Sequence, residues 1–497
     1  MSSLPKTIIM NLKNLKSNFV SGLGVTLIAS LQAIILAPIL ISTVGSTMYG
    51  AWIVLADVFV ALQIFDFGIT AYSAQRIAQA RANNLPKTQT AHFFASITIV
   101  VTLIAILNLI TLSTLHYFRF PVALSYQEIS TIRECAAIGI ASVSVQLLNY
   151  TLVAPSRALE RMRVVNVVTL LGAITALLIT LGLLYLDYGL YAAAYGMLAR
   201  SVMNLTGGLI SAYAFKDITS IKNLDSHKYT AALTDQLRNA PVTFLGNFSS
   251  IALSSSDGFL VSYFSGLQAV AVYSISKKLF DFVKTVVDVF TYSSYGGLAS
   301  AVAKLPLSRS IAFKHRYILV ALFLSASLCI GAYSIVDIFV KYWVDSSHYI
   351  GNYGALLIAL GALLASFSNF LFSLLRACGM FGNATMSILS EIVLKLLLSA
   401  VLIPVIGLNG MPVSIIFSAA IGSTISLAVL NPRLTFQGWF KYRWMVIGVL
   451  VALFFSAISN LIDGYEMVYF MKIAALIISA NVLRMAYSLL KHNDIEA

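Results

Sequence analysis

The stretch from Ala271 to Ser294, AVYSISKKLFDFVKTVVDVFTYSS, has the length and apolar content of a membrane-spanning helix, yet it contains five charged residues. These are Lys277, Lys278, Asp281, Lys284 and Asp288. The first, third, fourth and fifth are spaced by four, three and four, which puts them on one helical face. A charge at the bilayer centre costs about 2.5 to 3.5 kcal/mol, so this stripe is expected to face protein or a water-filled cavity. Two interpretations stay open: a transport pathway, or a self-neutralised ladder of Lys and Asp buried in a helix bundle.

The composition is that of a membrane protein. Of 497 residues, 59% are hydrophobic and 10% are charged, and the mean hydropathy is +0.88. Apolar runs of about 20 residues, the length that crosses a bilayer, recur along the chain. The formal charge of +13 does not indicate nucleic-acid binding, because Lys and Arg lie in short loops between apolar runs. The three cysteines form no CxxC pair, and no metal site is expected.

The sequence predicts an all-α, polytopic membrane protein with about 14 transmembrane helices. The expected spans are 19–42, 51–72, 93–115, 136–153, 164–186, 189–213, 242–263, 271–294, 317–338, 355–375, 384–406, 410–430, 445–462 and 467–489. Twenty-two basic residues fall on one side of this topology and only Arg119, Arg133 and Lys341 on the other. The positive-inside rule therefore predicts that both termini are cytoplasmic.

Three pairs of landmarks recur at nearly one offset. Gly45 corresponds to Gly266, the pair Arg157-Ala158 to Arg376-Ala377, and Gly189 to Gly407, at offsets of 221, 219 and 218. Because six spans separate the members of each pair, the chain is expected to form two pseudo-symmetric six-helix lobes of the same hand. The predicted parts are an N-lobe (1–215, spans 1–6), a cytoplasmic linker (216–241), a C-lobe (242–432, spans 7–12), and two extra helices with a cytoplasmic tail (433–497).

Two short motifs carry a resemblance to a known family. Gly45-Ser46-Thr47-Met48-Tyr49-Gly50 forms the first outer turn, and Asp66-Phe67-Gly68-Ile69 closes the second span. With the topology of the whole chain, they resemble the Wzx-type flippases of O-antigen and polysaccharide repeat units. These belong to the superfamily of multidrug, oligosaccharidyl-lipid and polysaccharide exporters. The chain departs from related flippases of peptidoglycan precursors in lacking arginine-rich first spans, and from many Wzx proteins in having fourteen spans.

The resemblance implies a transporter of the bacterial inner membrane that works by alternating access. Its substrate would be an undecaprenyl-pyrophosphate-linked oligosaccharide, flipped from the cytoplasmic to the periplasmic leaflet for O-antigen or related surface polysaccharide. Besides membrane lipids, a polysaccharide polymerase and a chain-length regulator are the expected partners. No cofactor and no catalytic residue are expected, and a proton or sodium gradient would drive transport.

Residues with suitable charge at membrane depth are the candidate site. Lysine is a mobile point charge for phosphate, and arginine can bind phosphate with two hydrogen bonds. The predicted cationic cavity therefore contains Lys277, Lys278, Lys284, Arg200 and Lys395. Glu391 precedes Lys395 by four residues, the favourable order for a helical ion pair, so a structural role for this pair remains open.

Acidic residues at membrane depth are the candidates for ion coupling, because a desolvated carboxylate can exchange protons. They are Asp57, Asp66 and Asp257, with Asp281, Asp288 and Glu391 as further cavity ion-pair candidates. For Asp66 a hydrogen bond to a helix end near Gly68 is the alternative. The functional alternatives are a cation-coupled multidrug exporter of the same superfamily and, in a different class, a membrane polysaccharide polymerase or ligase.

Overall fold

The computed structural model describes residues 12–114, 124–159, 161–304, 307–430, 447–449, 451–452, 456 and 465–491. In these ranges the regular structure is helical and contains no strand. Among the described residues, seven segments are long and apolar enough to cross a membrane, some of them comprising two helices. The all-α, multi-pass fold predicted from the sequence is confirmed, and 14 spans are consistent with it. The predicted span 445–462 lies largely outside the described residues.

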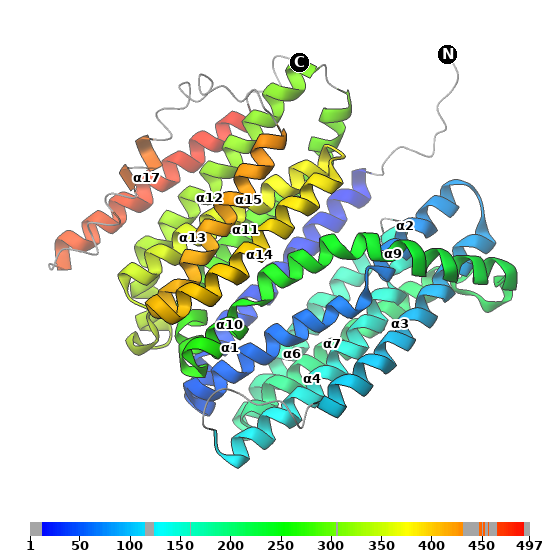
Figure 1. The fold of residues 1–497 in the computed structure, drawn as a ribbon, viewed down its shortest axis with the longest axis horizontal. Helices are drawn as coiled ribbons and strands as arrows, with labels where there is room; N and C mark the ends of the chain where they lie inside the picture. The colour runs from blue at the N-terminus through cyan, green and yellow to red at the C-terminus, as the bar shows by residue number, and fades with distance from the viewer. Residues whose placement is uncertain are drawn as a thin grey trace. The chain divides into compact units, whose positions relative to one another are not determined.

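The chain forms two compact units, Met1–Phe259 and Leu260–Ala497. The predicted boundaries between the N-lobe and the linker (215/216) and between the linker and the C-lobe (241/242) stay predictions. Figure 1 labels the main helices. The first unit contains α1 (Leu12–Leu62), η2 (Gln63–Asp66), α2 (Ile69–Ala82), α3 (Pro86–Thr114), α4 (Tyr126–Leu152), α5 (Ala154–Ala158), α6 (Arg163–Tyr185), α7 (Leu190–Ala214), α8 (Lys216–Thr219), η4 (Ile221–Asn223) and α9 (Ser226–Ser255).

In the first unit, small residues let α7 pack closely on both α4 and α6. A Cβ on Gly196 would lie 2.0 Å from the Thr180 hydroxyl of α6, and one on Gly208 would lie 2.5 Å from the Asn149 amide oxygen of α4. Membrane helices use such small residues because lipid supplies no hydrophobic drive for their association. These contacts build the bundle that holds the polar side chains of this unit.

The second unit is built on α11 (Leu267–Lys304) and the helices beside it. These are α12 (Leu307–Trp343), η5 (Ser346–His348), α13 (Asn352–Ala377), α14 (Phe381–Ile406), η6 (Gly407–Asn409), α15 (Gly410–Leu430) and α17 (Tyr465–Lys491). Helix α13 packs against α11, α12, α14 and α15, so it lies at the centre of the unit. Helix α10 (Asp257–Ser265) contains the boundary between the two units.

The last described helix, α17, packs against α12 (Figure 1). The buried Lys472 of α17 forms an ion pair with Asp337 of α12. The hydroxyls of Ser334 and Ser456 lie 2.9 Å apart and join α12 to the segment before α17. The added carboxy-terminal segment is thus attached to the second unit by polar contacts.

The landmarks of the predicted repeat have matching backbone conformations. Gly189 and Gly407 have φ angles of 55° and 62°, and Gly45 and Gly266 have φ angles of 78° and 85°. Positive φ is easily adopted only by glycine, which explains why glycine stands at both members of each pair. Helices α5 and α13 end at the equivalent alanines, Ala158 and Ala377.

Two predicted spans are interrupted in the structure: 242–263 breaks at Ser256, between α9 and α10, and 51–72 breaks near Gly68. The sequence predicts a helix through 51–72, but the helix breaks after Asp66, where Phe67 and Gly68 have φ angles of 46° and 75°. Asp66 then accepts hydrogen bonds from the backbone nitrogen (3.2 Å) and hydroxyl (2.8 Å) of Thr70 in the first turn of α2. Hydrophobicity is continuous across this break, so the apolar pattern could not reveal it.

Candidate functional site

The charged stripe of α11 is half-buried in the second unit. The Nζ atom of Lys277 lies 3.6 Å from Oδ1 of Asp281, and these side chains are 26% and 43% exposed. The Lys277 ammonium also lies 5.8 Å from the centre of the Tyr273 ring. A pair with this separation and exposure is weak, on the order of 0 to 1 kcal/mol. The end of the stripe that contains Lys277 and Asp281 is therefore not a fully buried ladder.

The other end of the stripe, which contains Lys284 and Asp288, contacts α13 and interacts with α14. Oδ1 of Asp288 accepts a 2.6 Å hydrogen bond from the Asn369 side chain of α13. The positive charge of Lys284 acts on both Asp288 and Glu391. The structure therefore brings together charged residues from α11 and α14 that lie about a hundred positions apart in the chain.

Glu391 and Lys395 lie in a polar seam between α14 and α15. Both are buried, with 1% and 2% exposure, and Oε2 of Glu391 accepts a 2.6 Å hydrogen bond from the Ser368 hydroxyl. The seam repeats every fourth residue on each helix, as Ser387, Glu391, Lys395 and Ser399 on α14 and Ser414, Ser418, Gly422 and Ser426 on α15. The hydroxyls of Ser399 and Ser414 lie 2.7 Å apart across it. This burial favours the structural interpretation of the Glu391 and Lys395 pair.

In the first unit, Arg200 and Asp66 belong to a polar group that the sequence did not delineate. The hydroxyl of Tyr150 donates a 2.9 Å hydrogen bond to the Gln63 side chain, and the Arg157 guanidinium lies 5.5 Å from the Tyr150 ring centre. Arg157 attracts Asp66 electrostatically, and Arg200 acts on Tyr150. Arg157 was visible only as a loop charge and a repeat landmark, while Gln63 and Tyr150 carried no signal in the sequence.

The structure also brings two of the predicted coupling acids together. The backbone nitrogen of Gly258 donates a 3.0 Å hydrogen bond to Oδ2 of Asp57. A Cβ on Gly258 would lie 2.3 Å from that oxygen, so a glycine is needed for this approach. Asp257, at the start of α10, is buried with 6% exposure. Asp57 of α1 thus bonds the residue that follows Asp257 in the first turn of α10.

A polar clamp between α2 and α9 was not predicted. Arg76 binds Asp235 with two hydrogen bonds, of 2.7 and 2.9 Å, and the Tyr72 hydroxyl donates a third, of 3.0 Å. Burial raises the pKa of Asp235, but the bonds from Arg76 and Tyr72 outweigh burial and hold it below its usual value. The Gln236 amide donates a 2.8 Å hydrogen bond to the His92 carbonyl of α3. The predicted linker segment is therefore partly a helix fixed to the first unit.

Comparison with known proteins assigns the family. The family described as "Polysaccharide biosynthesis protein" matches residues 13–295, more than half of the chain. The chain belongs to this family. A search of curated protein sequences finds no match.

Solved structures share the fold of this polysaccharide biosynthesis protein at low sequence identity. The lipid II flippase MurJ, in an inward closed conformation, matches with a TM-score of 0.70 and 12% identity over 97% of this chain and 100% of that one. An inward-facing multidrug resistance MATE transporter of the MOP superfamily matches with a TM-score of 0.65 and 13% identity, over 84% and 100%. A MOP superfamily transporter from Pyrococcus furiosus, described as having a binding pocket of reverse polarity, gives 0.60 and 14%, over 84% and 95%.

These matches confirm the expected resemblance in family and fold. The fold is shared with a solved flippase and with solved transporters. The protein is a multi-pass membrane protein. No comparison tests the roles of the individual candidate residues, which remain predictions.

Proposed function

We propose that the protein flips an undecaprenyl-pyrophosphate-linked oligosaccharide repeat unit from the cytoplasmic to the periplasmic leaflet of the bacterial inner membrane. The product would serve the synthesis of O-antigen or a related surface polysaccharide, with a polymerase and a chain-length regulator as downstream partners. Both termini would be cytoplasmic. The family description and the fold shared with a lipid II flippase support this proposal.

The half-exposed stripe of α11 is the observation that carries the proposal. Flipping changes no covalent bond; it requires a polar route for the pyrophosphate and sugars while the lipid tail stays in the bilayer. Three lysines and two aspartates give α11 a positive surplus. The weak contact between Lys277 and Asp281 can open when a phosphate competes for the ammonium, because lysine binds phosphate as a mobile point charge. Lys277, Lys278 and Lys284 are the proposed headgroup contacts.

A second cationic group would bind the headgroup in the first unit. Arg200 is half-buried on α7 and, in the described part of the chain, has no ion pair. Arg157 lies in the last turn of α5 and is exposed. Because both guanidiniums interact with Tyr150, a pyrophosphate could pass from one to the other along this side chain.

Ion coupling is proposed at Asp57 and Asp257. Protonation of Asp57 would neutralise the acceptor of the Gly258 N–H group and weaken its hold on the start of α10. Since α10 contains the boundary between the two units, this carboxylate is well placed to couple proton or sodium binding to lobe movement. Asp66 caps α2, and a coupling role for it has less support.

Complementation of a deletion strain tests the proposal. Lys277→Ala, Lys278→Ala and Lys284→Ala, at equal membrane abundance, are expected to abolish surface polymer and to strand intact lipid-linked repeat units on the cytoplasmic leaflet. Lys87→Ala, which removes an exposed lysine whose side chain is 61% accessible, is the matched control and keeps export. Retained export in all three α11 variants would contradict the proposal.

A cation-coupled multidrug exporter is the second candidate function. Asp257 at the start of α10, Asp57 of α1 that bonds the Gly258 backbone, and the fold shared with a MATE transporter favour it. A deletion strain with normal surface polymer and new drug sensitivity would establish this function in place of flipping.

A further inference from the structure

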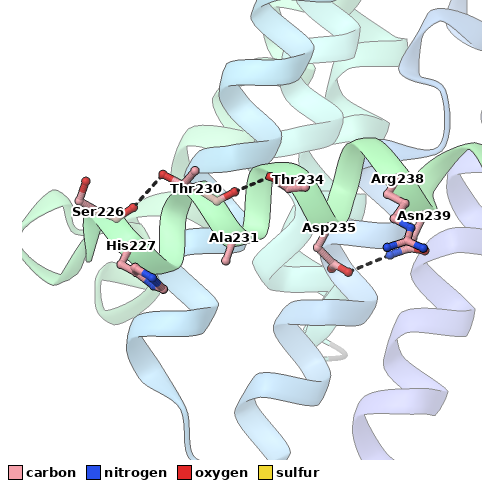
Figure 2. Close-up of a pocket in the computed structure, with 8 residues that line it drawn as sticks. All are labelled: Ser226, His227, Thr230, Ala231, Thr234, Asp235, Arg238 and Asn239. Carbon is pink, nitrogen blue, oxygen red and sulfur yellow. Dashed lines mark hydrogen bonds between the residues drawn. The ribbon is translucent and has the colours of Figure 1, made fainter.

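A hollow lies along the first half of α9, and the transport route proposed above does not include it. Its volume is about 980 Å³, near the upper end of the usual range for small-molecule sites. Figure 2 shows its eight described lining residues along α9. Their spacing places them on one side of the helix, as residues 226, 227, 230, 231, 234, 235, 238 and 239.

The lining is rich in neutral hydrogen-bonding groups. The Thr230 and Thr234 hydroxyls donate to the carbonyls of Ser226 and Thr230, at 3.1 and 3.0 Å, and these contacts are visible in Figure 2. Each threonine oxygen therefore keeps its lone pairs as acceptors. The Asn239 side chain donates a 2.8 Å hydrogen bond to Asp235, which leaves its amide oxygen and a second N–H group available.

The described lining of the hollow contains one acidic and one basic side chain, those of Asp235 and Arg238. Asp235 is the acidic residue of the lining, and Arg76 and Tyr72 already bind its carboxylate. Arg238 is exposed and, among the residues that the structure describes, forms no ion pair. The surface therefore offers hydroxyl and amide acceptors beside a free guanidinium with five donors. This combination matches the hydroxyls of sugars and the carboxylates of acidic sugars.

The face of α9 opposite the hollow packs against α3, which fixes the position of the helix. Ala232 is buried against Ala91 and Ala95 of α3, and Gln236 bonds the His92 carbonyl of the same helix. With the Arg76 clamp, these contacts fix the polar face before any ligand arrives. A fixed surface binds with a smaller loss of conformational entropy than one that must become ordered.

We propose that this face of α9 is a sugar-binding vestibule, which binds the oligosaccharide of the lipid-linked repeat unit on the cytoplasmic side before the headgroup enters the membrane. Thr230, Thr234 and Arg238 are the specificity-determining residues. The inference rests on the proposed function and adds to it a site for sugars, separate from the lysines that would bind pyrophosphate.

Binding measurements on the full-length protein in lipid nanodiscs test the vestibule. One probe is the water-soluble oligosaccharide released by mild acid from the lipid-linked repeat units of the source strain; the other is farnesyl pyrophosphate, which has no sugar. The double variant Thr230→Val/Thr234→Val and the variant Arg238→Gln are each expected to weaken oligosaccharide binding at least tenfold. Both are expected to change the binding of farnesyl pyrophosphate by less than twofold.

Thr102→Val is the matched control. Thr102 is an exposed threonine of α3 whose hydroxyl donates to the Thr98 carbonyl at 2.9 Å, the same local bond that Thr234 makes. It is expected to change neither affinity, and unchanged thermal unfolding shows that each variant is folded.

Three outcomes would overturn the vestibule. The first is that the wild-type protein does not bind the oligosaccharide, and the second is that both vestibule variants bind it with unchanged affinity. The third is that the variants lose affinity equally for the oligosaccharide and for farnesyl pyrophosphate, which would indicate a phosphate site. If the vestibule variants bind the oligosaccharide normally while Lys277→Ala abolishes export, the vestibule fails and the flippase proposal stands.

Discussion

Two pairs of opposite charges, each separated by four residues, have different surroundings in the second unit. Lys277 and Asp281 on α11 have side chains that are 26% and 43% exposed, whereas Glu391 and Lys395 on α14 are 1% and 2% exposed. The spacing is the same. The facing helix makes the difference, because α15 presents a serine or glycine at every fourth position to the α14 pair. The first pair is partly exposed, whereas the second is enclosed between helices, where Glu391 bonds Ser368 of α13.

Removing one member of the buried pair is expected to have the largest effect on stability. Glu391→Ala leaves the ammonium of Lys395 buried without its neighbouring carboxylate, which costs about 3 to 5 kcal/mol. The measurement is the free energy of unfolding in detergent micelles. The double variant Glu391→Met/Lys395→Met is expected to recover much of the loss, because replacing both buried charges by apolar side chains is often neutral. A Glu391→Ala protein as stable as the wild type would show that the two pairs do not differ.

Adding a methyl group at Gly422, where the chain closely approaches Glu391, is expected to have the next largest effect on stability. A Cβ there would lie 2.6 Å from Oε2 of Glu391, so Gly422→Ala must displace the carboxylate from Ser368. Overpacking of this kind costs about 1 to 3 kcal/mol. Gly182→Ala is the matched control, because a Cβ on this helical glycine meets nothing within 4 Å. Equal unfolding midpoints for both variants would argue against a tight seam.

The clamp between Arg76 and Asp235 offers an intermediate case, with side chains that are 35% and 25% exposed. Asp235→Asn is expected to cost about 1 kcal/mol, since partly exposed pairs are screened by solvent. Because the pKa of Asp235 is lower in the folded protein than in the unfolded chain, its contribution is full above the unfolded pKa of about 4 and is lost as the pH falls through the folded value. Unfolding measured from pH 8 to pH 3 should show a constant difference between the two proteins that shrinks only below about pH 4. A difference that instead grew below this pH would contradict the assignment.

The half-buried pair on α11, Lys277 and Asp281, is expected to have the smallest effect on stability. Lys277→Ala removes a contact of 3.6 Å between half-exposed side chains, so the free energy of unfolding should change by less than about 1 kcal/mol. Thermal unfolding in the same micelles provides the value. A loss of stability as large as that of Glu391→Ala would instead support the interpretation of the stripe as a buried ladder of Lys and Asp.

The sequence predicted the parts of the molecule that depend on apolar periodicity and on glycine. The repeat was visible because Gly189 and Gly407 both need a positive φ, and the charged stripe of α11 was visible because its spacing is helical. The break at Phe67 and Gly68 was not predicted, because the apolar pattern runs through it. Contacts between distant segments were also hidden: nothing local connects Asp57 to Gly258 or Arg76 to Asp235. For the same reason, spacing could not separate the exposed charge pair from the buried one.

Reconstituted transport tests the central claim most directly. The purified protein is placed in liposomes whose outer leaflet carries the lipid-linked repeat unit of the source strain, and the arrival of the repeat unit in the inner leaflet is followed by its protection from an external glycosidase. The wild-type protein is expected to transfer the repeat unit, and the variant Lys277→Ala/Lys278→Ala/Lys284→Ala is expected to lose at least tenfold in rate while it remains folded by thermal unfolding. Transfer by this variant at the wild-type rate would contradict a flippase that works through the lysines of α11.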